Sequence, residues 1–185
     1  MLDLLLGLKW VQENIAEFGG DPNNVTLFGQ SAGSANVMAL SLMEESQGLY
    51  HKLIAQSGTF GISPEPDEAR KVAAEFIRQS GAETMADLEK LSVNELIALY
   101  KKVEKKISSA SGVLFGPIYD GKLLPKDPYQ ALANGKMTQV PFMNGTTKDE
   151  INMWLEFVPV VKKIPIIAGK ILAKRSGLEK IVFNC

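Results

Sequence analysis

The sequence predicts an α/β fold with a mostly parallel sheet and flanking helices, and three stretches of the chain carry this prediction. Residues 25–28 are a short β-branched and aromatic run, which indicates a buried strand. The small and apolar residues at 32–42 are typical of a buried helix, and residues 53–57 are a second apolar strand. Because strand, helix and strand in succession form a βαβ unit, the two strands are expected to run parallel.

A GxSxG pattern lies between the first strand and its helix, at Gly29, Gln30, Ser31, Ala32 and Gly33. In this strand–turn–helix context the pattern is typical of the nucleophile elbow of a serine hydrolase. A serine on so tight a turn has strained backbone angles, and glycine neighbours let the strand and the helix approach closely. Ser31 is therefore the candidate nucleophile.

Helices are expected on both sides of this unit. Residues 3–17 carry Leu4, Leu8, Val11 and Ile15 at helical spacing, which predicts an amphipathic core helix. They do not resemble a signal peptide, because Asp3 interrupts the leucines and no basic residue precedes them.

A helical region is predicted at residues 59–115, where the pattern changes from strands to helices. One helix begins at residues 64–67, and a second carries a run of charged side chains that is expected to face solvent. The expected inner faces are Ala69, Val72, Ala73, Phe76 and Ile77 in the first helix, and Leu96, Ile97, Leu99, Tyr100 and Val103 in the second.

Composition is that of an ordinary globular chain, with 185 residues, 45% of them hydrophobic and 22% charged. The net charge of −1 gives no reason to expect a nucleic-acid partner. The single cysteine, Cys185, excludes an intrachain disulfide or a cysteine-based metal cluster, and no metal or cofactor is expected. Together with the lack of a signal peptide, it favours a cytoplasmic location. Nothing in the sequence indicates an oligomeric state.

An acidic pair follows another predicted strand. Asp127, Pro128 and Gly135 mark the start and end of a short helix, and residues 140–145 then read as a sheet strand. Asp149 and Glu150 come just after it. Sites in open parallel sheets form at the carboxyl ends of the strands, so an acid here is expected at the same edge as Ser31.

A serine nucleophile needs a histidine as its base, and the sequence offers no well-placed candidate. The chain has one histidine, His51, and it comes just before the second strand. His51 is therefore expected at the amino end of its strand, about 16 Å from Ser31 at ~3.3 Å per residue. α/β-Hydrolases place the histidine after the acid, and residues 151–185 contain none. We therefore do not expect His51 to be the catalytic base.

Several linked motifs accompany the GQSAG turn. Residues 8–16 and 18–22 precede it, QSG at 56–58 follows it, and PIYDG at 117–121 and NGTTKDE at 144–150 come later. Together these motifs resemble the type B carboxylesterase family, which includes para-nitrobenzyl esterases and cholinesterases. The resemblance implies the α/β-hydrolase fold and the hydrolysis of a small-molecule carboxylic ester through an acyl-enzyme.

The resemblance assigns roles to three residues. Ser31 is the nucleophile, Glu150 is the triad acid, and the backbone N–H of Ala32 belongs to the oxyanion hole. It gives His51 no catalytic role, and it implies that Ser57 is structural. Gln30 stands where many relatives carry glutamate, which argues against a cationic substrate.

The match also implies that the chain is an incomplete, internal fragment of one partial domain. The glycine-rich HGG motif and the histidine motif of the family are absent from residues 1–185, so we expect the chain to be inactive by itself. From about residue 158 the similarity ends, and residues 158–185 are interpreted as a divergent tail or lid. The prolines in this tail argue against a membrane-surface helix, which is the alternative interpretation.

Two other functions fit an incomplete triad. A non-catalytic relative would use the esterase fold as a protein-interaction domain, as neuroligin-like adhesion domains do. A partner could also supply the histidine to a small hydrolase. The retention of GQSAG and Glu150 favours an esterase over a long-standing loss of activity.

Overall fold

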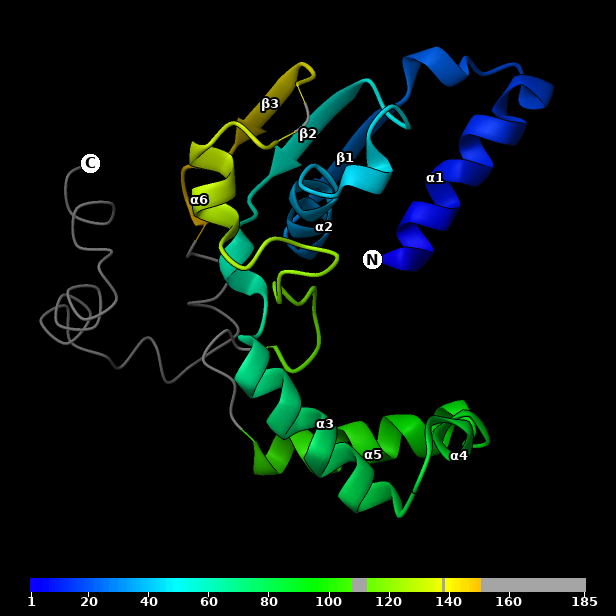
Figure 1. Cartoon of the computed structure of the whole chain (residues 1–185), viewed down its shortest axis with the longest axis vertical. Helices are drawn as coiled ribbons and strands as arrows, with labels where there is room; N and C mark the ends of the chain where they lie inside the picture. The colour runs from blue at the N-terminus through cyan, green and yellow to red at the C-terminus, as the bar shows by residue number, and fades with distance from the viewer. Residues whose placement is uncertain (108–112, 138, 151–185) are drawn as a thin grey trace, which may run out of the picture. The chain divides into compact units, whose positions relative to one another are not determined.

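The structure is a computed structural model that describes residues 1–107, 113–137 and 139–150 (Figure 1). The chain divides into two compact units, residues 1–145 and residues 146–185. The helices and strands described below belong to the first unit. The predicted tail at 158–185 lies outside the described residues.

A three-stranded parallel sheet forms the centre of the first unit. It consists of β1 (Thr26–Gln30), β2 (Lys52–Gln56) and β3 (Phe142–Gly145), in the order β1-β2-β3. β2 pairs in parallel with both neighbours. The prediction of an α/β fold with parallel strands is confirmed.

One face of this sheet packs against α2 (Ala32–Leu40), the helix that follows the elbow. Leu27 and Leu53 are register partners on that face. Leu53 belongs to the core cluster that includes Val37, Ala39 and Leu40 of α2, and Leu27 packs against this cluster. On the opposite face, Phe28, Ile54 and Met143 are aligned across the three strands. Phe28 is 74% exposed and Met143 is 67% exposed, so this face is uncovered in the described part of the chain.

The amino-terminal helix α1 (Leu2–Asn14) continues into a 3-10 turn, η1 (Ile15–Phe18). The side-chain amide of Gln12 holds it to the sheet region by donating to the carbonyls of Pro22 (2.8 Å) and Leu49 (3.0 Å). The helix is as predicted, but its buried face is not: Leu5 and Leu8 are buried, whereas Leu4 is 41% exposed.

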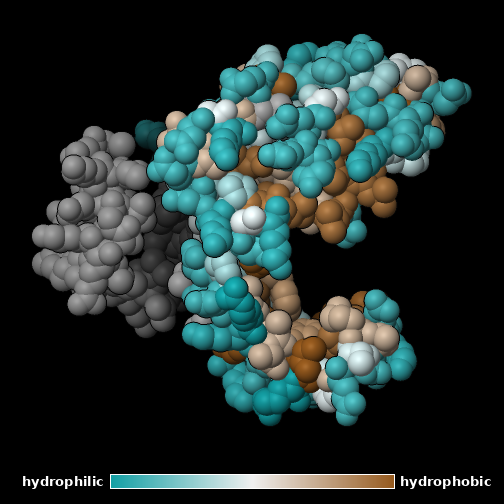
Figure 2. All heavy atoms as spheres, viewed as in Figure 1, coloured by the Kyte–Doolittle hydropathy of each residue, from teal (hydrophilic) through white to brown (hydrophobic). Residues whose placement is uncertain are grey.

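Three leucines in the amino-terminal half of α1 are exposed. Leu2 is 63% exposed, Leu4 is 41% exposed and Leu6 is 67% exposed, and hydrophobic residues gather over the amino-terminal half of α1 in Figure 2. Helical spacing identifies apolar residues, but only packing decides which of them are buried.

Two short 3-10 turns and one short helix complete the sheet region. η2 (Pro22–Asn24) leads into β1, and η3 (Glu44–Ser46) lies between α2 and β2. In α6 (Pro128–Ala133), Asp127 Oδ1 accepts a hydrogen bond of 2.8 Å from the Gln130 N–H, and Gly135 after the helix has φ +70°. The predicted start and end signals of this helix are confirmed.

Three helices fall inside the predicted helical region: α3 (Pro66–Ser80), α4 (Met85–Glu89) and α5 (Val93–Lys106), preceded by a 3-10 turn, η4 (Phe60–Ile62). Reciprocal capping boxes begin α4, at Thr84 and Asp87, and α5, at Ser92 and Glu95. α3 and α5 pack against each other around a second apolar cluster of Val72, Leu99, Val103 and Leu114.

The inner faces of these two helices are narrower than predicted. Ala73, Ile77 and Ile97 are exposed, because the contact between two helices covers a narrow stripe on each. No helix among the described residues is both long and apolar enough to cross a membrane.

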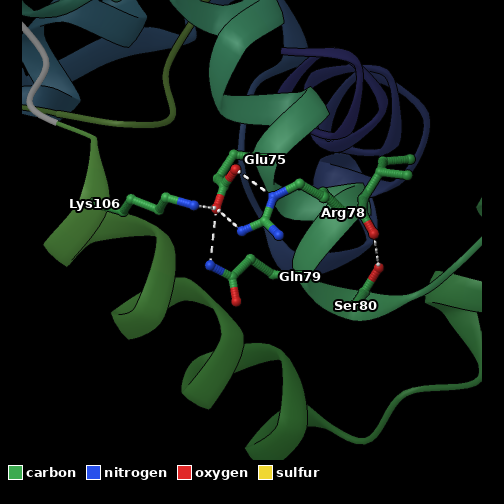
Figure 3. A network of polar contacts seen from close by, with 6 residues as sticks. Glu75, Arg78, Gln79, Ser80 and Lys106 are labelled. Carbon is green, nitrogen blue, oxygen red and sulfur yellow. Dashed lines mark hydrogen bonds and ion pairs between the residues drawn. The ribbon is translucent and has the colours of Figure 1, made fainter.

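A polar network joins α3 to α5 beside this cluster (Figure 3). The Glu75 carboxylate accepts hydrogen bonds from Arg78 Nε (2.8 Å) and Nη2 (2.7 Å) and from Gln79 Nε2 (2.8 Å). It also forms an ion pair of 3.0 Å with Lys106 of α5. The hydrogen bonds from Arg78, and then those from Lys106 and Gln79, hold the pKa of Glu75 well below its usual range. Lys106 belongs to the charged run at 101–106 that was expected only to face solvent, and this ion pair makes it an exception.

We expect Glu75→Gln to weaken the pH dependence of this helical pair. Because the folded-state pKa of Glu75 is lowered, its stabilising effect is complete above the ordinary value of 4.5 and is lost as the pH falls below it. Acidification should therefore destabilise α3 and α5 less in the variant. Amide hydrogen exchange in α5 at neutral and acidic pH measures this. Glu104→Gln, which removes a carboxylate that contacts Tyr100, is the matched control, and an unchanged acid response in Glu75→Gln would contradict the prediction.

Candidate active site

The turn after β1 holds Ser31 in a strained conformation. Ser31 has φ +55° and ψ −118°, a region that non-glycine residues rarely occupy. Its N–H donates to the Gln56 carbonyl of β2 (2.9 Å), and its carbonyl accepts from the Ala35 N–H of α2 (3.0 Å). The Ser31 side chain makes no capping hydrogen bond. Strain of this kind persists only where the surroundings enforce it, and it clusters at functional sites.

The two glycines of the elbow differ in what they contribute. A Cβ added to Gly29 would lie 2.3 Å from the Gly33 carbonyl carbon and 2.8 Å from the Ser34 nitrogen, so only glycine lets β1 approach α2 this closely. A Cβ added to Gly33 would meet nothing within 4 Å. The expectation that glycines permit the close approach is confirmed for Gly29, whereas no contact in the described chain requires Gly33.

The N-terminus of α2 presents a hydrogen-bond donor next to Ser31. Ala32 is the first helical residue and is exposed. The first N–H groups of an α-helix have no intrahelical acceptor and carry the positive end of the helix dipole. Since the Ser31 N–H is already bonded to Gln56, the Ala32 N–H is the next donor along the chain. This geometry suits the stabilisation of an oxyanion that forms at Ser31.

The carboxyl ends of the three strands lie side by side. Gln30 pairs with Gln56, Gln56 pairs with Gly145, and the Ser57 N–H donates to the Gly145 carbonyl (2.9 Å). Glu150 comes five residues after Gly145 and belongs to the second unit. There it is partly buried, and its Oε1 accepts a hydrogen bond of 2.7 Å from the Thr147 N–H. The assignment of Glu150 as triad acid stays a prediction.

His51 lies at the opposite end of the sheet from Ser31. Its N–H donates to the Val25 carbonyl (2.8 Å), and its Nδ1 accepts from the Val25 N–H (3.2 Å). Both contacts are at the amino ends of β1 and β2, whereas Ser31 follows the carboxyl end of β1. The sequence-based argument against His51 as the base agrees with this placement. Its ring instead helps to join the two strands.

A cavity of about 460 Å³ has aromatic side chains in its wall, and one of them is Phe60, two residues after Gly58. Phe60 packs edge-to-face against Tyr119 and Tyr129 in its wall, with ring centroids 5.9 Å and 5.3 Å away. Burial raises the pKa of Tyr119 to about 12. The cavity has the volume of a small-molecule pocket. Among the described residues, no group of three or more His, Cys, Asp or Glu side chains is placed to hold a metal ion.

Comparison with known proteins identifies the family. The family model described as "Carboxylesterase family" matches residues 1–175, which is nearly the whole chain, so the similarity extends beyond residue 158, where the motifs alone placed its end. This chain belongs to the carboxylesterase family. Its curated relatives include the para-nitrobenzyl esterase of Bacillus subtilis (strain 168), which is 37% identical over 154 residues, covering 81% of this chain and 31% of the relative. Liver carboxylesterase B-1 of Rattus norvegicus is 34% identical over 176 residues, covering 85% of this chain and 31% of the relative.

Solved carboxylesterase structures have the same fold. The Geobacillus stearothermophilus carboxylesterase EST55 at pH 6.2 superposes with a TM-score of 0.78 at 32% identity, covering 94% of this chain and 36% of that one. A PNB esterase structure superposes with a TM-score of 0.70 at 36% identity, covering 80% and 32%. The fold is therefore that of an α/β-hydrolase, as the resemblance implied. The chain spans about 31% of the length of the curated relatives named above.

The structure shows a contact near Ser31 that the sequence did not indicate, between Ser34 and Gly58. Ser34, on α2, is fully buried, and its hydroxyl has no hydrogen-bond partner in the described structure. Gly58, after β2, packs directly against it. In the sequence, Gly58 stands out only as the last residue of the QSG motif at 56–58, and the motif does not show that Gly58 contacts a residue 24 positions earlier in the chain.

Proposed function

We propose that this chain carries the nucleophile and the acid of a serine esterase that hydrolyses small carboxylic esters. The observation that carries the proposal is the conformation of Ser31, whose positive φ is enforced at a strand-to-helix turn with the Ala32 N–H beside it. Ser57 also has a positive φ, but no helix begins directly after it, so the strain points to a nucleophile only together with the helix N-terminus beside Ser31. Family membership and the names of the relatives, para-nitrobenzyl esterase and liver carboxylesterase, support an ester as the substrate.

The reaction follows from these groups. Ser31 Oγ attacks the ester carbonyl carbon, and the Ala32 N–H stabilises the negative charge on the carbonyl oxygen of the tetrahedral intermediate. A histidine accepts the Ser31 proton and transfers it to the leaving alcohol, and Glu150 orients that histidine. Water then attacks the acyl-enzyme, releasing the acid and restoring Ser31.

His51 is not that histidine in this proposal. Its Nδ1 is bonded to the backbone at the far end of β1, so the base must come from outside residues 1–185. Triad members act as a unit, and the loss of one removes several orders of magnitude in rate. The chain alone should therefore hydrolyse p-nitrophenyl acetate no faster than its Ser31→Ala variant.

A chimera tests the proposal. Residues 1–150 replace the matching segment of the Bacillus subtilis para-nitrobenzyl esterase, which supplies the rest of an esterase. We expect this chimera to hydrolyse p-nitrophenyl acetate and to react with a fluorophosphonate at Ser31. His51→Asn should keep the activity, because the asparagine side-chain oxygen can accept the hydrogen bond from the Val25 N–H in place of Nδ1. A folded chimera that neither hydrolyses the ester nor reacts with the fluorophosphonate would favour the non-catalytic, protein-interaction function instead.

A further inference from the structure

Gly58 is a glycine for a reason other than its backbone angles. Its φ lies outside the left-handed region, so an L-residue could adopt its conformation. A Cβ added there would, however, lie 2.4 Å from both Cβ and Oγ of Ser34 and 2.9 Å from the Ser31 carbonyl oxygen. These contacts are shorter than any that real Cβ atoms make. The side-chain-free position is therefore required by contact with the elbow.

Ser34 is closely packed in the fold. It is fully buried on α2, three residues after Ser31. On the strand side of the same helix, a Cβ added to Gly29 would lie 2.8 Å from the Ser34 nitrogen. The start of α2 is thus held between two glycines, one at the end of β1 and one just after β2.

The residues before Gly58 hold the same region by hydrogen bonds. The Gln56 carbonyl accepts the Ser31 N–H, and the Ser57 N–H donates to the Gly145 carbonyl of β3. Ser57 has φ +50°, and Ser31 and Ser57 are the non-glycine residues with positive φ in the described chain. The two strained residues therefore belong to the two segments that contact each other here.

We propose that Gly58 is a positioning residue for the nucleophile: its missing side chain lets the segment after β2 close on Ser34, and this contact holds Ser31 at its strained φ. The catalytic consequence rests on the proposed function of Ser31, whereas the effect on the backbone of Ser31 does not. A side chain at position 58 displaces the start of α2, which lengthens the Ser31-to-Gln56 hydrogen bond and lets the elbow relax.

Amide hydrogen exchange in the 185-residue chain tests the backbone effect. In Gly58→Ala, the Ser31 and Ala35 amides should exchange about tenfold faster or more, because overpacking at a rigid contact destabilises it locally. The amides of Leu99 and Val103 in the helical pair should not change, which reports on folding in the same sample. Gly61→Ala is the matched control, since a Cβ there would meet nothing nearer than 3.7 Å.

Second-site variants test whether the contact with Ser34, rather than a general loss of stability, causes the change in exchange. Ser34→Gly removes both atoms that lie 2.4 Å from the added Cβ, so the double variant Gly58→Ala/Ser34→Gly should recover most of the protection. Ser34→Ala keeps the clashing Cβ and should not rescue. If Gly58→Ala prevents folding of the sheet region, recovery in the first double variant but not in the second still decides the question.

Kinetics in the chimera test the catalytic consequence. Gly58→Ala should lower kcat with little change in KM, and Ser34→Gly should restore it. Unchanged exchange at Ser31 in Gly58→Ala, or equal rescue by Ser34→Ala and Ser34→Gly, would overturn the positioning role of Gly58. Altered exchange at Ser31 without any esterase activity in the unsubstituted chimera would overturn the proposed function and leave the backbone role standing.

Discussion

Replacing Ser31 with alanine should lower kcat of the chimera for p-nitrophenyl acetate by about 10⁴-fold or more, because the acyl-enzyme can no longer form. The Ser31 side chain makes no capping hydrogen bond, so its removal should leave the elbow folded. Stopped-time assays with the substrate blank subtracted measure the residual rate. Fluorophosphonate labelling of the same protein should disappear with the activity.

Ser57→Ala and Ser34→Ala are informative comparisons, because both serines lie close to the elbow in the folded chain. Fluorophosphonate should still modify the protein at Ser31 in either variant. Labelling that persists in Ser31→Ala at the rate of the unsubstituted chimera would show that another residue is the nucleophile.

Replacing Glu150 with glutamine should lower kcat of the chimera by about 10³- to 10⁴-fold, the effect of a triad acid that no longer fixes the histidine tautomer or stabilises its charged form. Glutamine has nearly the same shape as glutamate and can still accept the Thr147 N–H through its amide oxygen. The loss should therefore be catalytic rather than structural. Substrate binding, measured as KM, should change much less than kcat.

Asp149→Asn provides the matched control, since it removes a neighbouring carboxylate by the same chemical change. We expect this variant to keep close to the full activity. Equal losses of kcat in the two variants would indicate a general effect of removing negative charge after β3. Full activity in Glu150→Gln would remove Glu150 from the proposed triad.

The βαβ unit was predictable from the sequence because its signals are local. A β-branched run before Ser31, a helix of small and apolar residues after it, and a second apolar run at 53–57 each have one favoured structure. Parallel pairing then follows from connectivity. The place of His51 was predictable for the same reason, since its position before β2 fixes the end of the sheet at which it lies.

Burial was less predictable because it depends on partners elsewhere in the chain. Helical spacing in α1 identifies Leu4 and Leu8 equally well, yet only Leu8 is buried. Ile97 of α5 carries the same apolar signal as Leu99, but α3 reaches only Leu99. In both helices the sequence marks a hydrophobic face wider than the contact that covers it.

The sequence by itself determined the identity of the candidate nucleophile, because GQSAG between a strand and a helix is a local pattern that only a tight elbow explains. Tertiary structure alone decided what holds that elbow: the Gln56 carbonyl bonded to the Ser31 N–H, and Gly58 in contact with Ser34. These contacts join residues more than twenty positions apart, so the QSG motif that contains Gly58 does not itself show that Gly58 packs against Ser34. The strain at Ser31 is consequently encoded locally but maintained by the neighbouring strand.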